Sequence, residues 1–212
     1  MTVDNIKEIY GAIVEGRVEE AAGAVEKALD SGATPHDILN EGLISAMDLV
    51  GEKFGEGEYF IPQVMWAAKA MQAGMDVLKP HLAAGEQTDR GKIIIGTAKG
   101  DIHDIGKNLV SIMMEGAGFK VIDLGVDVEA STFVERAQAE GAGVIAISAL
   151  LTTTMQSMAE VVALIREKNL SPLKVLVGGA PVDRAFCEEI GADAYGVDAV
   201  DGVRKARELM GV

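Results

Sequence analysis

The sequence has one cysteine, few basic side chains and no long apolar run, and each shortage excludes a class of protein. Cys187 alone cannot support a disulfide framework or a zinc site built from cysteines. With 33 acidic against 19 basic residues the net charge is −14, which disfavours binding to phosphate backbones. No apolar run approaches the roughly 18 residues of a membrane span, and the start, MTVDNIKEIY, lacks the order of a signal peptide. We therefore expect a cytoplasmic protein without nucleic-acid or membrane partners.

What remains is typical of a folded chain with two parts. Hydrophobic residues make up 49% of the 212 residues and charged residues 25%, which is too apolar for disorder. Residues 1–91 carry a net charge of −9 and residues 92–212 a net charge of −5, and glycine becomes frequent in the second part. The small, polar stretch 83–91, AAGEQTDRG, is typical of a linker. We expect one domain over 1–88 and another over 89–212.

The first part has the apolar spacing of helices. Thr34 and Pro35 form an N-cap and a first helical position, and Pro62 opens a later segment. Short connections at glycine suit antiparallel neighbours. The pattern predicts a four-helix bundle with helices at 6–13, 18–29, 34–54 and 62–78, and its methionine-rich stripes are more typical of core than of a ligand surface.

The second part alternates strand and helix. Short β-branched runs predict buried parallel strands, and the segments between them have helical spacing. Five such units indicate an α/β fold with a doubly wound, Rossmann-like or flavodoxin-like, five-stranded parallel sheet. The predicted strands are 92–97, 120–124, 143–148, 174–177 and 194–197. Because ligands bind beyond the carboxyl ends of such strands, the loops to inspect are 98–103, 149–154 and 178–182.

These three loops carry the candidate chemistry. His103 lies between Asp101 and Asp104, and a carboxylate bonded to one imidazole nitrogen leaves the other free to bind a metal or move a proton. The hydroxyl-rich run 148–154 and the glycines at 178–179 suit a polar group entering between strands. A lone loop histidine is more often only solvated, so the three loops together carry the hypothesis. The dinucleotide-like run 141–146 precedes its strand and is excluded.

The combined pattern resembles a known family. D-x-H-D-x-G, S-x-L and G-G, within the longer run GTAKGDIHDIGKNLV, are similar to the cobalamin-binding module of cobalamin-dependent methionine synthase and of corrinoid methyl-carrier proteins. The segment VGEKFGEGEYFIPQVMWAAKAM resembles the helical cap that precedes this module. The resemblance spans nearly all of the chain.

The resemblance implies a bound cobalamin and a role for each motif residue. His103 would be the lower axial ligand of cobalt in place of the dimethylbenzimidazole of the cofactor, Asp101 would bond its second nitrogen, and Thr154 would stand where the methionine synthase pattern has serine. Further cofactor contacts would come from Gly100, Asp104, Ile105, Gly106, Ser148, Leu150, Thr152, Gly178, Gly179 and Ala180. The upper, methyl-bearing face would be covered by Phe60, Val64 and Met65.

The resemblance also implies a function. The chain would carry a methyl group as methylcobalamin, without catalysing the transfers alone, because it has no room for a TIM barrel. Its partners would be separate donor-specific and acceptor-specific methyltransferase subunits and a reductive activator. Donors in such systems are methanol, methylamines, quaternary amines or aryl methyl ethers, and acceptors are coenzyme M or tetrahydrofolate. Two alternatives stay open: a cobalamin-dependent sensor, although residues 1–91 lack a basic recognition helix, and a flavodoxin-like domain for another ligand with a structural His103.

Overall fold

The structure is a computed structural model that describes residues 2–82, 90–170 and 172–212. The chain divides into two compact units, of which the second begins at Arg90. The expected boundary between residues 88 and 89, and most of the expected linker, lie outside the described residues.

The first unit is helical, as predicted. Its elements are α1 (Thr2–Val14), α2 (Val18–Asp30), α3 (Pro35–Asp37), η1 (Ile38–Ile44), α4 (Ser45–Gly55), α5 (Ile61–Leu78) and η2 (Lys79–His81). Helix α2 packs against α1 and α5. Gly74 permits the close packing of α5, since a Cβ atom there would lie 3.0 Å from the Leu43 side chain and 3.3 Å from that of Val25. The fully buried side chains include Ile9, Ile13, Val25, Ile38, Leu43 and Leu78.

The predicted helix over 34–54 is divided by a π-helical segment, η1. Its start is as predicted, because the Thr34 hydroxyl accepts a hydrogen bond of 3.1 Å from the Asp37 N–H. At the end of η1 the Ser45 N–H bonds the Asn40 carbonyl, and the Ser45 hydroxyl donates to the same carbonyl at 2.6 Å. The wider turn inserts a residue into the helical repeat. A spacing of apolar residues does not reveal this insertion, because the apolar face continues through it.

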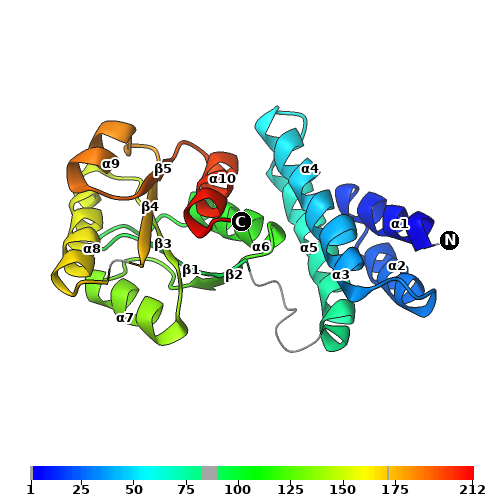
Figure 1. Ribbon diagram of the computed structural model, residues 1–212. Coiled ribbons are helices and arrows are strands. Elements are labelled where there is room, and N and C mark those ends of the chain that lie inside the picture. Colours follow the sequence, from blue (N-terminus) through cyan, green and yellow to red (C-terminus); the bar gives the residue numbers. More distant parts are fainter. Residues whose placement is uncertain (1, 83–89, 171) are drawn as a thin grey trace. The chain divides into compact units, whose positions relative to one another are not determined.

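The second unit alternates strands and helices. Its strands are β1 (Lys92–Thr97), β2 (Lys120–Asp123), β3 (Val144–Ser148), β4 (Lys174–Gly178) and β5 (Ala194–Gly196). Its helices are α6 (Ile105–Gly116), α7 (Ala130–Glu140), η3 (Thr152–Thr154), α8 (Gln156–Glu167), α9 (Arg184–Ile190) and α10 (Ala199–Met210). The sheet is parallel in the order β2-β1-β3-β4-β5, which confirms the flavodoxin-like, doubly wound fold. Helices α6 and α10 cover one face of the sheet, and α7, α8 and α9 cover the other (Figure 1).

The register of the sheet aligns the carboxyl ends of four strands. Thr97 pairs with Ser148, Ser148 with Gly178, and Gly178 with Gly196. The loops that follow β1, β3 and β4 therefore begin side by side at one edge. The strand order reverses between β1 and β3, so the loops after these two strands flank the switch point, where doubly wound sheets bind ligands.

Over the described parts of the chain, no helix combines the length and the apolar character that a membrane crossing requires.

Candidate functional site

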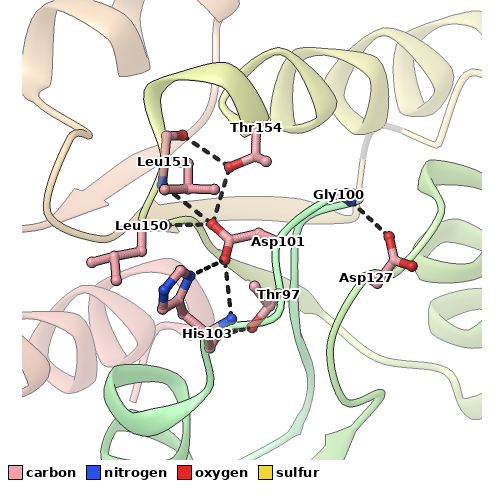
Figure 2. A network of polar contacts seen from close by, with 8 residues as sticks. All are labelled: Thr97, Gly100, Asp101, His103, Asp127, Leu150, Leu151 and Thr154. Carbon is pink, nitrogen blue, oxygen red and sulfur yellow. Dashed lines mark hydrogen bonds and ion pairs between the residues drawn. The ribbon is translucent and has the colours of Figure 1, made fainter.

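The loop after β1 brings Asp101 to the centre of a polar network at the switch point (Figure 2). Its carboxylate is fully buried. Oδ1 accepts hydrogen bonds from the His103 N–H at 3.0 Å and from the His103 ring nitrogen Nδ1 at 2.6 Å. Oδ2 accepts from the Leu150 N–H at 2.7 Å, the Leu151 N–H at 3.2 Å and the Thr154 hydroxyl at 3.0 Å. One carboxylate thus connects the β1 loop to the β3 loop.

This environment sets the charge of Asp101. Burial by itself would raise the pKa of the carboxyl, but the hydrogen bonds from the Leu150 and His103 N–H groups, the His103 ring and the Thr154 hydroxyl hold that pKa well below its usual range. Asp101 is therefore an anion and an acceptor at neutral pH. The facing Nδ1 of His103 must then carry a proton, so Nε2 of the neutral ring holds the lone pair.

His103 presents this second nitrogen to the outside. Its side chain is 48% exposed, and no hydrogen bond from the described part of the chain reaches Nε2. The backbone carbonyl of His103 accepts a 2.9 Å bond from the hydroxyl of buried Thr97. The ring is thus fixed at Nδ1 and its backbone at the carbonyl, while Nε2 is available to a ligand.

The Thr154 hydroxyl has two acceptors within reach. It lies 3.0 Å from Asp101 Oδ2 and 2.8 Å from the Leu151 carbonyl oxygen. A hydroxyl has one proton and two lone pairs. It can therefore donate to an ionised Asp101, or accept from a protonated Asp101 while it donates to Leu151.

Exposed apolar side chains lie at this edge of the sheet, on the loops after β1, β2 and β3 and at the start of α6. Ile102 and Ile105, which flank His103 in the sequence, are 75% and 76% exposed, and Leu150 and Val126 are exposed as well. Large apolar side chains that are this exposed beside a polar group indicate a binding surface. The surface suits a ligand with an apolar face, and His103 Nε2 offers a nitrogen lone pair at the same edge of the sheet.

A cavity of about 210 Å³ opens at the same end of the sheet. Its wall is largely apolar and rich in glycine, and its residues come from β1, β3, β4 and β5, from the loops that follow β4 and β5, and from helices α6 and α10. Gly179, with φ of +120°, brings the β4 loop against the β3 loop, because a Cβ there would lie 1.9 Å from the Ala149 carbonyl oxygen. Of the residues expected to contact cofactor, five line this cavity: Gly106, Ser148, Gly178, Gly179 and Ala180.

The other expected residues lie elsewhere. Thr152 is exposed on η3, and Leu150 contacts Asp101 through its N–H. Gly100 and Asp104 flank the Asp101–His103 pair, and the Asp104 carboxylate accepts a 3.1 Å bond from the Asn108 amide. None of these residues lines the cavity.

In the first unit, the expected cover residues divide into two groups. Phe60 and Met65 are exposed, whereas Val64 is fully buried and is unavailable to a ligand in this conformation. Ile61 and Trp66, which the sequence did not single out, are also exposed at the start of α5. The available apolar surface is thus Phe60, Ile61, Met65 and Trp66.

Sequence motifs also missed several groups around Asp101. The N–H groups of Leu150 and Leu151 are backbone donors, which no side-chain pattern can reveal. Asp127, which accepts a 2.7 Å bond from the Gly100 N–H, lies 26 positions beyond Asp101 and outside the motif. Its only signal was its place just after a predicted strand at the same edge of the sheet.

Two family profiles match the chain, and both are described as B12 binding domains. One covers residues 91–204 and the other residues 6–79. Together they account for both structural units.

Individual relatives match over nearly their whole length. The chain is 45% identical to dimethylamine corrinoid protein 2 of Methanosarcina mazei, covering 97% of this chain and 96% of that protein. It is 42% identical to a corrinoid protein of Desulfitobacterium hafniense, over 100% of both. A chain in the crystal structure of the methanol:cobalamin methyltransferase complex of Methanosarcina barkeri superposes with a TM-score of 0.89 at 31% identity, covering 98% of this chain and 80% of that one. The chain belongs to the family of corrinoid proteins, with a helical B12-binding domain followed by a Rossmann-like one and a corrinoid as its cofactor.

Proposed function

We propose that this protein holds a corrinoid with His103 as the lower axial ligand of cobalt and carries a methyl group between separate methyltransferases. The observation that carries the proposal is the fixed orientation of His103. Its Nδ1 is bonded to a buried, ionised carboxylate, and its Nε2 is available at the switch point. This is the arrangement in which a protein imidazole serves as a metal ligand.

The surroundings fit the cofactor. The exposed Ile102, Ile105, Val126 and Leu150 offer apolar contact to the flat face of a macrocycle around the imidazole. The glycine-rich cavity offers room for the displaced nucleotide tail, with Ser148 as a polar contact. Among the described residues, no group of three or more His, Cys, Asp and Glu could hold a metal without such a macrocycle.

Each polar residue has a distinct task in this proposal. The Asp101 carboxylate keeps the proton of His103 on Nδ1 and directs the Nε2 lone pair outward. Thr154 and the Leu150 and Leu151 N–H groups hold the carboxylate in place. When bound, the corrinoid supplies a cobalt nucleophile that accepts and releases a methyl group. Loss or gain of a proton in the His103-Asp101-Thr154 relay would then accompany changes in ligation.

The methyl-carrier role is supported by the names of the relatives. The chain is similar to proteins named for dimethylamine and trimethylamine and to one in a methanol methyltransferase complex. We therefore infer partners of two kinds, a donor-specific and an acceptor-specific methyltransferase, together with a reductive activator in the cytoplasm. Methylamines are the first donors to test, and coenzyme M and tetrahydrofolate are the acceptors. In this scheme residues 1–88 form the cap domain and 89–212 the cobalamin-binding domain.

The test is reconstitution with hydroxocobalamin followed by desalting and an ultraviolet–visible spectrum. The wild-type chain should retain one corrinoid, and His103→Ala should change its spectrum. His36→Ala is the matched control, since His36 is exposed in the first unit. A wild-type chain that retains no corrinoid, or a His103→Ala variant with the wild-type spectrum, would contradict the proposal.

The carrier role is tested with the reduced, reconstituted protein and purified methyltransferases for dimethylamine, trimethylamine and methanol. Methylation of the bound corrinoid with at least one donor, dependent on the matching methyltransferase, is the expected result. Failure with these donors, and with the methyltransferases for quaternary amines and aryl methyl ethers, would leave a binding protein and contradict the carrier role.

A further inference from the structure

We propose that Asp127 is a positioning residue that fixes the β1 loop from outside the site and so sets the orientation of His103. The inference rests on the proposed function, since the orientation matters only if His103 binds the cofactor. Asp127 lies on the loop after β2, on the opposite side of the β1 loop from Thr154 (Figure 2).

Asp127 contacts the β1 loop through both its side chain and its backbone. Its carboxylate accepts a 2.7 Å hydrogen bond from the Gly100 N–H. Its own N–H donates a 2.9 Å hydrogen bond to the Asp101 carbonyl oxygen. The two bonds hold the peptide group before Gly100 and the peptide group after Asp101, so the backbone between them, which sets the direction of the Asp101 side chain, is fixed at both ends.

The backbone of Asp127 adopts a strained conformation at this contact. Its φ is +55°, and in the described part of the chain only Asn169 is another non-glycine residue with positive φ. Aspartate tolerates this left-handed conformation better than most residues, but it is still strained. Gly100, its partner, is also left-handed, with φ of +81°. A strained residue at the edge of a site, bonded to another left-handed residue, favours a positioning role over a neutral loop.

Neighbouring hydrogen bonds extend this contact between β1, its loop and the loop after β2. The Thr97 N–H donates to the Gly125 carbonyl at 2.9 Å, and the Val128 N–H donates to the Thr97 carbonyl at 3.0 Å. The hydroxyl of the same Thr97 bonds the His103 carbonyl. The loop that carries Asp101 and His103 is therefore held on one side by the β3 loop and on the other by the β2 loop. Asp127 makes the contact from the β2 loop.

Three substitutions separate the side-chain acceptor from the backbone conformation. Asp127→Asn keeps an acceptor oxygen and tolerates positive φ. Asp127→Gly keeps the conformation but removes the acceptor. Asp127→Ala removes both. Asn169→Ala is the matched control, because it strains a left-handed position at the end of α8, away from the site.

The first readout uses the chain without corrinoid. Ring ¹⁵N chemical shifts of His103 at a fixed pH of about 8, where imidazole is neutral, report which nitrogen carries the proton. We expect the proton on Nδ1 in the wild type, in Asp127→Asn and in Asn169→Ala. Asp127→Gly and Asp127→Ala should shift toward the Nε2–H form that a free imidazole prefers.

The second readout is the dissociation constant for hydroxocobalamin and the spectrum of the bound form. Loss of one charge-assisted hydrogen bond should raise the dissociation constant about fivefold in Asp127→Gly, and Asp127→Asn should restore it. If Asp127→Gly matches the wild type in both readouts, the proposal is overturned. This holds even if Asp127→Ala is impaired, because that variant also changes the backbone conformation. If the wild type does not bind corrinoid through His103, the proposed function fails. The tautomer of His103 then still tests the positioning role of Asp127.

Discussion

Asp101 is the residue on which the site depends, because five donors converge on its two oxygens. Four of the five donors are N–H groups, which cannot accept a proton from the carboxyl, so these contacts favour the anion over the protonated acid. The same contacts fix the loop conformation and the histidine tautomer. Asp101 therefore has both a structural role, in the loop conformation, and the proposed functional role, in the orientation of His103.

Asp101→Asn should lower the free energy of unfolding by about 2 to 3 kcal/mol near pH 7, since the amide places an N–H₂ against existing donors. The folded pKa of Asp101 lies below the unfolded value of 3.8, so its stabilisation is complete above that value and is lost as pH falls further. Urea unfolding of both proteins from pH 7 to pH 2 measures this. The difference between them should be constant above about pH 5 and shrink below about pH 4. A difference that grows in acid would contradict the assignment.

Thr154→Val removes one hydroxyl at nearly constant volume, whereas Thr154→Ser keeps the hydroxyl. The valine variant should lose about 1 kcal/mol of stability and show a changed spectrum of bound corrinoid, and the serine variant should keep the wild-type spectrum. Urea unfolding and the reconstituted spectrum measure the two effects. Equal behaviour of the two variants would show that the hydroxyl takes no part in the relay.

The sequence predicted the side chains of this site better than its backbone. Asp101, His103 and Thr154, predicted to form a relay, lie within hydrogen-bond distance in the structure. Their roles stay predictions. The Leu150 and Leu151 N–H groups could not be predicted, because a donor that every residue carries becomes specific only through the loop conformation.

At the scale of elements, two glycines that line the cavity, Gly179 and Gly106, differ in whether the fold requires them. Gly179 is required by the fold, since any Cβ there would overlap the Ala149 carbonyl. Gly106 lines the same cavity from the first turn of α6, but a Cβ atom there would meet no side chain or neighbouring element of the described chain within 4 Å. The fold does not require glycine at position 106, so a ligand is the better reason for it.

Gly106→Ala should therefore stabilise the corrinoid-free chain by about 0.5 kcal/mol and weaken hydroxocobalamin binding about tenfold. Urea unfolding and a binding titration measure the two effects. Gly23→Ala is the control, because Gly23 lies on α2 with equally open space around it. It should gain the same stability without a change in binding. Unchanged binding in Gly106→Ala would show that no ligand approaches this turn.

The regular elements followed from local pattern, and the irregular ones did not. Strand β1 has the predicted bounds, 92–97, because a β-branched run is a local signal. The π-helical η1 depends on Ser45 bonding the Asn40 carbonyl, and η3 lies in the segment 149–154, which the sequence predicted as a loop. Both depend on hydrogen bonds that a hydrophobic pattern does not encode.

At the scale of the molecule, the chain has two units with separate cores. We predict that they unfold independently. The one tryptophan, Trp66, lies in the first unit and reports on it by fluorescence, while circular dichroism reports on both. Phe133→Leu, in the core of the second unit, should destabilise that unit by about 1 to 2 kcal/mol without moving the fluorescence midpoint. A fluorescence midpoint that moves with this substitution would show that the units unfold together.

The most direct test of His103 as the ligand of cobalt is an electron paramagnetic resonance spectrum. The protein is produced with ¹⁵N-histidine and then loaded with Co(II) corrinoid. An axial nitrogen splits each cobalt line into a triplet when it is ¹⁴N and into a doublet when it is ¹⁵N. Ligation by His103 predicts doublets in the labelled protein and triplets in the unlabelled protein. The doublets should be absent from labelled His103→Ala. Triplets that persist in the labelled protein would show that the corrinoid keeps its own base, and His103 would not be the ligand of cobalt.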